Sequence, residues 1–181
     1  MKSQIHLGGK TFVPFIQNDE IMKSIDRVAA QINADFKGRE EIPVILCVLN
    51  GAVMFTTELM QRLDFDCEFS SIRLSSYQGT QSTGRTKQVL GLTTDLFGRS
   101  VIIVEDIVDT GRTIADLVAI IKGTGAKDIK VCTLLLKPDV FDRATHIDYV
   151  AMEIPNRFIL GFGLDYDQVG RNYKDIYVIE Q

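Results

Sequence analysis

The segment VIIVEDIVDTGRT, residues 101–113, carries the residue types that bind a phosphorylated sugar and a divalent cation. An apolar, β-branched run at 101–104 precedes Glu105 and Asp106. A third acid, Asp109, comes directly before Thr110 and Gly111. Carboxylate oxygens are ligands that Mg²⁺ prefers. A glycine turn that opens a helix presents free backbone N–H groups and the positive end of the helix dipole to an anion. The segment therefore predicts a site for a phosphorylated sugar and its metal ion.

Two other interpretations of this segment stay open on the residues alone. Thr113 and Asp116 match a capping box, in which Thr113 satisfies only the helix's own amides, and Gly111 could supply only a positive φ. Phospho-acceptor domains with a doubly wound sheet also hold Mg²⁺ on acids at strand ends. Their acids lie on separate strands, whereas Glu105, Asp106 and Asp109 follow one strand here.

The elements that must position this segment alternate between buried strands and amphipathic helices. Asn18 or Asp19 can cap a helix that runs to Phe36, since apolar residues recur there at helical spacing. Apolar runs typical of strands and periodic runs typical of helices follow along the chain. Strands are expected at 44–49, 65–74, 101–104 and 129–136, and helices at 52–63 and 114–122. The order predicts an α/β fold, a mostly parallel twisted sheet flanked by helices, with Glu105 and Asp106 at a strand's carboxyl end, where such sheets bind ligands.

Two regions break this alternation. Residues 75–88 are polar and show neither helical nor strand periodicity, which is typical of a lid loop. After Lys137 the helical period disappears, and short apolar segments at 149–154, 158–162 and 176–179 alternate with loops. These segments predict a small irregular β-containing hood. A single domain of residues 1–181 is expected, with a core of about 18–136 and a hood of mainly 137–181 that the N-terminus helps to complete.

Composition narrows the class of protein. With 181 residues, 45% of them hydrophobic and 24% charged, the chain fits one ordinary globular domain. A formal charge of −4 without a basic block argues against nonspecific nucleic-acid binding and implies that a divalent cation bridges the chain to an anionic substrate. No signal segment and no apolar run near the roughly 18 residues of a membrane span are present, so no membrane partner and a cytoplasmic location are expected.

The cysteines and histidines predict no further catalytic or metal centre. Cys47, Cys67 and Cys132 form an odd set without CxxC spacing and are expected to be reduced core thiols. His6 and His146 lie near no nucleophile or second ligand, which argues against a catalytic triad or a multi-histidine zinc site.

Residues 101–113 closely resemble the phosphoribosyl diphosphate signature of the type I phosphoribosyltransferases. Further segments resemble those of the hypoxanthine-guanine phosphoribosyltransferases in the same order: LNGAVMF (49–55), SSYQGTQSTG (75–84), LLLK (134–137) and EIPNRFILGFGLDY (153–166). The resemblance implies a Mg²⁺-dependent purine salvage transferase that joins hypoxanthine or guanine to 5-phosphoribosyl diphosphate, giving IMP or GMP and diphosphate. Because relatives form dimers and tetramers, it also implies a homo-oligomer.

The same resemblance assigns residues to the sugar. Asp109 corresponds to the general base that takes a proton from the purine imidazole, and Mg²⁺ is implied at Glu105, Asp106 and Asp165. The phosphoribosyl group is expected to bind Glu105, Asp106, Asp109, Thr110, Gly111, Arg112 and Thr113.

For the diphosphate and the lid, the resemblance implies further positions. Asn50 and Gly51 match a segment with a non-proline cis peptide, taken here as Asn50-Gly51, whose amide meets the diphosphate, and Arg171 matches a basic residue beside it. Many relatives carry Lys or Arg where this chain has Asn50, so the Gly51 backbone is the stronger candidate. Ser76 and Tyr77 match lid residues that exclude water from the reactive sugar.

Lys137 is the main predicted purine ligand. It ends an apolar strand, where a buried ammonium needs a partner, and the resemblance implies that this partner is the purine 6-oxo oxygen. Such a contact disfavours adenine, whose exocyclic amine is a donor. Phe158 matches the ring that stacks on the base, although its apolarity alone favours a core position, and the Ile159 backbone is expected to read the base edge. The predicted purine site also contains Arg157, Leu164 and Asp165.

Two alternatives remain. A regulatory phosphoribosyltransferase-like protein that senses the sugar and binds nucleic acid would keep residues 101–113 but would not need Lys137 and Phe158. A pyrimidine-preferring transferase would need other base-edge partners than residues 153–166 suggest, and one side chain at the purine 2-position could favour xanthine.

Overall fold

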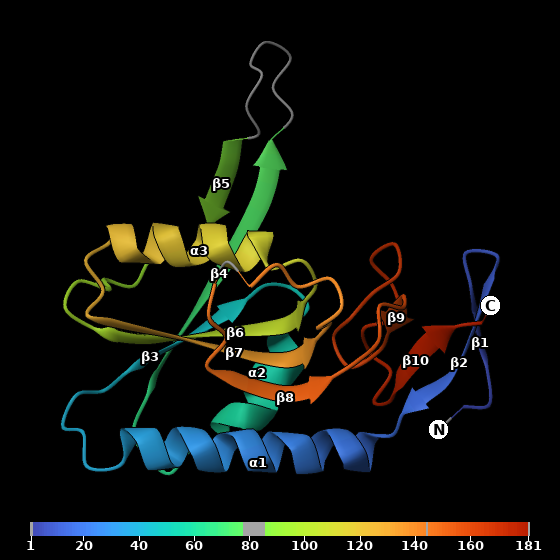
Figure 1. Cartoon of the computed structure of the whole chain (residues 1–181), viewed down its shortest axis with the longest axis horizontal. Coiled ribbons are helices and arrows are strands. Elements are labelled where there is room, and N and C mark those ends of the chain that lie inside the picture. The colour runs from blue at the N-terminus through green and yellow to red at the C-terminus, as the bar shows by residue number, and fades with distance from the viewer. Residues whose placement is uncertain (1, 78–85, 144, 181) are drawn as a thin grey trace.

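The computed structural model describes residues 2–77, 86–143 and 145–180, and its main element is a twisted sheet with helices on both faces (Figure 1). Within the described residues this sheet has the strand order β5-β4-β3-β6-β7-β8. All neighbours pair in parallel except β5, which is antiparallel to β4. The predicted mostly parallel α/β fold is therefore confirmed. The strands are β3 (Val44–Val48), β4 (Glu68–Tyr77), β5 (Thr86–Leu90), β6 (Ser100–Val108), β7 (Asp128–Leu136) and β8 (Tyr149–Glu153).

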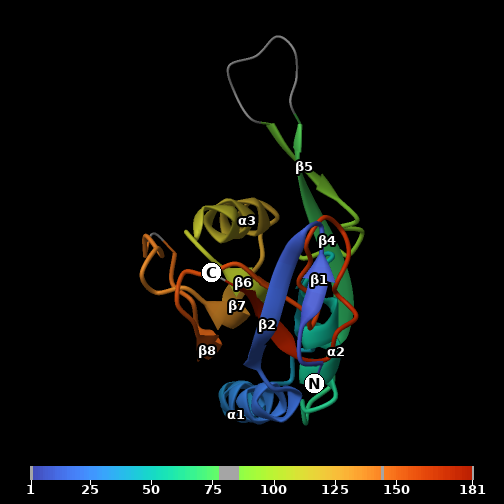
Figure 2. The ribbon, with the colours of Figure 1, turned by 90° about the vertical axis from the view of Figure 1, so that its right-hand side faces the viewer.

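Helices cover both faces of this sheet, as Figures 1 and 2 show. Helices α1 (Asn18–Phe36) and α2 (Val53–Met60) lie on one face, and α3 (Arg112–Gly123) lies on the other. On β3, Val44 and Leu46 pack in the cluster that contains α3, whereas Ile45 packs in the cluster beneath α1 and α2. Because successive side chains of a strand point to opposite faces, a sheet covered on both faces requires the uninterrupted apolar runs of the sequence.

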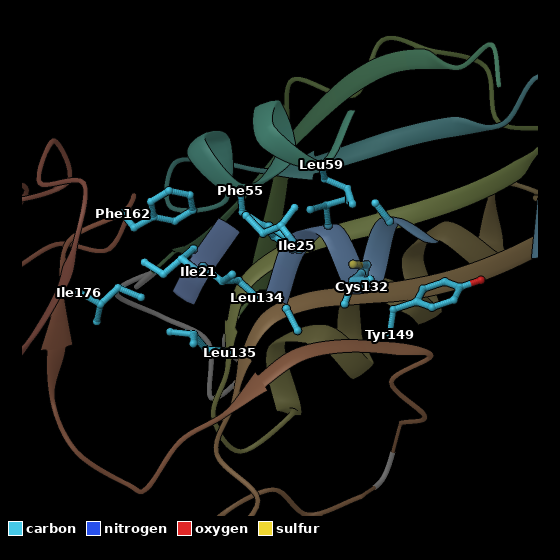
Figure 3. Packing of buried hydrophobic residues seen from close by; sticks show 14 of the residues in the cluster. Ile21, Ile25, Phe55, Leu59, Cys132, Leu134, Leu135, Tyr149, Phe162 and Ile176 are labelled. Atoms are coloured by element: carbon cyan, nitrogen blue, oxygen red, sulfur yellow. The ribbon is translucent and has the colours of Figure 1, made fainter. Parts of the chain in front are cut away.

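The core beneath α1 and α2 also fixes the smaller sheet to the larger one (Figure 3). Ile21 and Ile25 of α1 and Phe55 of α2 are fully buried against the strands. Phe162 and Ile176, from the C-terminal part of the chain, join the same cluster. Each such side chain contributes about 1.5–3 kcal/mol by leaving water, so this cluster holds both sheets in one arrangement.

The smaller sheet, called the hood below, has the order β1-β2-β10-β9 and is antiparallel. The N-terminus contributes two of its strands, as expected. The hood consists of β1 (Ile5–Leu7), β2 (Lys10–Ile16), β9 (Ile159–Leu160) and β10 (Ile176–Ile179). The prediction that residues 149–154 belong to the hood was wrong. Tyr149–Glu153 forms β8, which extends the main sheet parallel to β7, because Tyr149 and Ala151 are buried beneath α1.

Helix α1 receives its N-terminal cap from the far end of the chain. Asp175, which is buried, accepts a hydrogen bond from the Asn18 N–H (2.9 Å), and the Asn18 side chain donates to the Lys174 carbonyl (2.9 Å). The N-cap residue is Gln17, whose side chain makes no capping bond. The predicted cap at Asn18 or Asp19 was therefore wrong, since the acceptor comes from a loop distant in sequence.

The polar segment 75–88, predicted to be a lid loop, contains strand residues at both of its ends. β4 continues to Tyr77, and β5 begins at Thr86, directly opposite. The predicted strand end at residue 74 was wrong because an antiparallel backbone ladder needs no apolar side chains. Residues 78–85 and the side chains of Ser76 and Tyr77 lie outside the described residues, so the lid stays a prediction.

Two further expectations concern the cysteines and the membrane. Cys47 and Cys132 are buried and Cys67 is partly buried, and burial raises the pKa of each thiol. No helix in the described ranges is long and apolar enough to cross a membrane.

Candidate active site

Glu105 and Asp106 lie within β6, opposite the point at which its neighbour β3 has ended. β3 pairs with β6 only as far as Val104, whereas β7 continues to pair with it through Val108. The predicted strand end at Val104 was wrong, because pairing with β7 extends β6 to Val108. The two acids follow the last residue of β6 that β3 pairs with.

Burial and mutual repulsion dominate the electrostatics of this pair. The Glu105 side chain is almost fully buried, and desolvation, followed by the negative charge of Asp106, raises the pKa of Glu105 well above its usual range. Backbone N–H groups of Asp106 and Ile107 donate to the carboxylates of Glu105 and Asp106, at 3.3 and 2.9 Å. Two adjacent carboxylates of this kind are stabilised by a cation.

The turn after β3 presses against Asp106. Its cis peptide is Leu49–Asn50, one bond earlier than the Asn50-Gly51 position predicted. A Cβ on Gly51 would overlap the Asp106 carboxylate, and a Cβ on Gly163 would overlap the Gly51 carbonyl. Only glycine fits both positions, so the buried Gly51 backbone lies beside the acids while the Asn50 side chain is exposed.

The segment after β6 forms the turn that the sequence predicted, with an earlier helix start. Gly111 has φ +88° and is the N-cap of α3, and the Phe141 ring fills the space that a Cβ would need. α3 begins at Arg112 rather than at Ile114. The capping-box interpretation of Thr113 was wrong, since Thr113 lies inside the helix and Gly111 has no side chain with which to cap it. The first-turn N–H groups have no partners within the helix.

A pocket of about 150 Å³ opens at this turn. Its lining contains most of the residues predicted for the phosphoribosyl group, but not Asp106 or Arg112. It is lined by Glu105, Ile107, Val108, Asp109, Thr110, Gly111, Thr113 and Ile114. Hydroxyls, backbone amides and a helix N-terminus around one small volume suit a phosphate.

Lys137 finds its required partner in the same turn. Its side chain is buried immediately after β7, and its Nζ lies 3.1 Å from Asp109 Oδ2 and 3.3 Å from Asn156 Oδ1. Asp109 is itself 54% exposed. Sequence reasoning missed Asn156, although its place two residues before Phe158 in EIPNRF was a signal that could have found it.

Phe158 lies at the surface beside two aromatic rings, Phe12 of β2 and Tyr166 of the segment between β9 and β10. It is 46% exposed, which excludes the core position that its apolarity suggested. Its ring packs edge-on against Tyr166, with centroids 5.6 Å apart, and its centroid lies 6.2 Å from that of Phe12. Neither Phe12 nor Tyr166 was singled out from the sequence. Ile159 and Leu164, predicted beside Phe158, are buried.

Asp165 and Arg171 are already engaged with each other. Arg171 Nη2 lies 2.5 Å from Asp165 Oδ1, and its Nη1 donates to the Gly163 carbonyl at 2.7 Å. The Gln168 N–H donates to Asp165 Oδ2 at 2.8 Å. Arg171 thereby holds Gly163, the residue that packs against the Gly51 carbonyl. Both carboxylate oxygens of Asp165 have partners.

Arg157 retains one unused donor. Its Nη2 donates to the Ile179 carbonyl at 2.7 Å, whereas its buried Nε has no hydrogen-bond partner among the described residues. The guanidinium is thus fixed to β10, and its Nε–H has no hydrogen-bond partner among the described residues.

Of the three residues predicted to bind Mg²⁺, only Glu105 and Asp106 lie next to each other, whereas Asp165 is paired with Arg171. Glu105 and Asp106 offer adjacent carboxylates, but the described ranges contain no group of three or more His, Cys, Asp or Glu side chains that could hold an ion. Mg²⁺ commonly takes one or two protein carboxylates and completes its shell with substrate phosphates and water, which suits this pair.

Comparison with known proteins agrees with this geometry. Residues 16–167 match the family model "Phosphoribosyl transferase domain". The chain is 39% identical to the hypoxanthine-guanine phosphoribosyltransferase of Streptococcus thermophilus, over 92% of each protein. It is also 39% identical to the hypoxanthine-guanine-xanthine phosphoribosyltransferase of Tritrichomonas foetus, over 90% of this chain and 88% of that protein.

A solved structure and a longer relative complete the comparison. The hypoxanthine phosphoribosyltransferase of Trypanosoma cruzi, as a mutant in a ternary substrates complex, superposes with a TM-score of 0.84 at 32% identity, covering 92% of this chain and 94% of that one. The bifunctional protein TilS/HprT of Listeria innocua is 39% identical over 91% of this chain, which spans about a quarter of that relative's length. The chain belongs to the phosphoribosyl transferase domain family and, within it, to the group of hypoxanthine-guanine phosphoribosyltransferases.

Proposed function

We propose that this protein transfers the phosphoribosyl group of 5-phosphoribosyl diphosphate to hypoxanthine or guanine, releasing diphosphate and forming IMP or GMP. The transfer breaks the bond between the anomeric carbon and the diphosphate oxygen and forms a bond from that carbon to an imidazole nitrogen of the purine. Positive charge builds on the ribose and negative charge on the diphosphate, so placement and charge stabilisation supply most of the catalysis.

The observation that carries this proposal is the contact between Lys137 and Asp109. It joins the phosphate-binding turn after β6 to the purine half of the site at 3.1 Å. A lysine here donates to a 6-oxo oxygen, and an aspartate here accepts the imidazole proton. Both groups can therefore reach one base placed next to the anomeric carbon.

The sugar half of the site follows from the turn. Thr110, Thr113 and the first-turn N–H groups of α3 receive the 5′-phosphate, and Glu105 and Asp106 receive the ribose hydroxyls. Glu105 and Asp106 would hold Mg²⁺ together with the substrate, and the ion would supply positive charge to offset the charge of the departing diphosphate. The Gly51 backbone faces the diphosphate, and Arg171 supports it through Gly163.

The purine half combines a donor with a ring. Lys137 selects a 6-oxo acceptor, and the exposed face of Phe158 stacks on the base. Arg157, which directly precedes Phe158 in the sequence, has an Nε–H that can donate to the substrate. Adenine presents a donor to Lys137 and is therefore rejected.

The proposal is tested by offering phosphoribosyl diphosphate and Mg²⁺ with hypoxanthine, guanine, xanthine, adenine or uracil in separate reactions and by following nucleotide formation chromatographically. Turnover confined to 6-oxopurines is expected, and their relative rates rank hypoxanthine, guanine and xanthine. Turnover of adenine would contradict the assignment of Lys137, and turnover of uracil would contradict the assignment of a purine acceptor. Binding of the sugar diphosphate without turnover of any base would favour the regulatory alternative.

A further inference from the structure

The environment of Lys137 contains two acceptors of different kinds. Its ammonium is buried, so its N–H groups need partners. One acceptor is the carboxylate of Asp109, and the other is the side-chain amide oxygen of Asn156 at 3.3 Å. An ammonium has three donors, so the third can reach a substrate while both contacts persist.

The Asp109 carboxylate does not keep the same interaction with Lys137 throughout the reaction. In the proposed transfer, Asp109 accepts the imidazole proton and becomes neutral, which removes its charge from Lys137. Asp109 is also 54% exposed, so water can solvate it without Lys137. Lys137 thus loses its charged partner at the stage at which it must stay on the 6-oxo oxygen.

Asn156 keeps its acceptor through this change because an amide neither gains nor loses a proton. It lies in the bend between β8 and β9, an exposed segment fixed at both ends. Before it, the Ile154 N–H donates to the carbonyl of Leu136, the residue next to Lys137, at 2.9 Å; after it, the Ile179 N–H donates to the Phe158 carbonyl at 3.0 Å. One bend therefore carries an anchor for the lysine and the ring that stacks on the base.

We propose that Asn156 is a positioning residue that holds the Lys137 ammonium toward the 6-oxo oxygen of the purine throughout the transfer. This inference rests on the proposed function, since it assumes a 6-oxopurine acceptor. It assigns Asn156 no contact with the sugar or the diphosphate. Loss of the amide oxygen should therefore weaken use of the purine and leave use of the sugar diphosphate intact.

The test is steady-state kinetics of Asn156→Ala, Asn156→Leu and Asn156→Asp, with KM measured separately for hypoxanthine and for phosphoribosyl diphosphate. Ala and Leu remove the acceptor, and Leu also keeps the side-chain size, so both should raise the KM for hypoxanthine roughly tenfold, about the effect of one hydrogen bond to a charged group. The KM for the sugar diphosphate should stay within about twofold, because a localised change leaves the sugar half unaltered. Asn156→Asp retains an acceptor oxygen and should restore most of the lost affinity.

Asn172→Ala is the matched control, because Asn172 is an exposed asparagine in the same part of the chain and should leave every constant unchanged. The inference is overturned if Ala and Leu leave the KM for hypoxanthine unchanged, if both KM values rise together, or if Asp fails to restore what Ala loses. Thermal unfolding of each variant shows that it is folded. Absence of 6-oxopurine turnover in the unmodified protein would instead remove the proposed function, and this inference with it.

Discussion

The two halves of the candidate site are built in opposite ways. The sugar half consists of backbone and an adjacent pair of carboxylates at the end of a sheet that is covered on both faces: Glu105 is 8% exposed, and Gly51 admits no side chain. The base half presents side chains from exposed bends and the hood, and Phe158 is 46% exposed. The contact between Lys137, buried after β7, and Asp109 joins the two halves.

This difference in construction predicts that the sugar half determines the rate of transfer and that the base half determines which base is used. A sugar half fixed by main-chain geometry tolerates little change, because most of its donors are backbone N–H groups, which no substitution can replace one at a time. A base half made of individual side chains can change one contact without moving the sheet. Substitutions in the first half should therefore affect every acceptor base equally, whereas substitutions in the second should depend on the base.

Asp106→Asn should have the largest effect. It removes one of two carboxylates beside the ribose, so kcat/KM for phosphoribosyl diphosphate should fall roughly 10²- to 10³-fold. The loss should be equal with hypoxanthine and guanine. Asp66→Asn, which alters an exposed aspartate elsewhere on the chain, is the matched control. A loss confined to one base would break the separation of the two halves.

Lys137→Met comes next. It removes the donor to the 6-oxo oxygen and leaves Asp109 without its ion pair, so kcat/KM for hypoxanthine should fall about 10²-fold and discrimination against adenine should decrease. Rates with both bases are compared with those of Lys122→Met, which changes an exposed lysine on α3. Undiminished preference for hypoxanthine over adenine would rule out the role given to Lys137.

Phe158→Ala should have a smaller effect that is restricted to the base. Loss of one aromatic stacking partner costs about 1–3 kcal/mol, which corresponds to a rise of roughly 5- to 150-fold in the KM for hypoxanthine. Stability should change little, because the ring is already half exposed. Phe97→Ala, at a phenylalanine that is 76% exposed, serves as the control. An equal rise in the KM for the sugar diphosphate would contradict the separation.

The smallest effect concerns stability rather than rate. Since burial and Asp106 raise the pKa of Glu105, the folded state binds this proton more tightly than the unfolded state. Ionised Glu105 therefore lowers stability progressively as pH rises above its unfolded pKa of about 4.3. Glu105→Gln should raise the thermal midpoint of the ligand-free protein at pH 8, by about 2–4 °C for each kcal/mol gained.

That gain should shrink as pH falls toward 4, where Glu105 is protonated in both states. Scanning calorimetry of Glu105→Gln and the unmodified protein across this range measures it. A difference in midpoint that stays constant with pH would show that Glu105 is not a destabilised carboxylate.

The core was predictable from the sequence because its strands are apolar on both faces. The runs at 44–49 and 129–136 became β3 and β7 with boundaries shifted by a single residue. Features set by distant backbone were not predictable. The cap that Asp175 provides for α1 joins residues from opposite ends of the chain, and the pairing of β4 with β5 continues to Tyr77 and Thr86, within a segment that has no strand periodicity.

The site followed the same rule. Residues of the turn after β6 could be expected to lie together because they are contiguous in sequence, and most of them line one pocket; their binding of a phosphate stays a prediction. Partners from other elements were missed: Asn156 on Lys137, and Phe12 and Tyr166 beside Phe158. Spacing along a chain cannot show which side chains a fold brings together from separate loops.

The separation of the two halves is tested most directly by calorimetric titration of Mg²⁺ and phosphoribosyl diphosphate into the double variant Lys137→Met/Phe158→Ala. The expected result is a Kd for the sugar diphosphate within about threefold of the unmodified protein, because neither substituted side chain lines the pocket at the turn after β6, together with loss of hypoxanthine turnover. A Kd that weakens in step with turnover would show that sugar and base share one set of contacts, and would contradict the account.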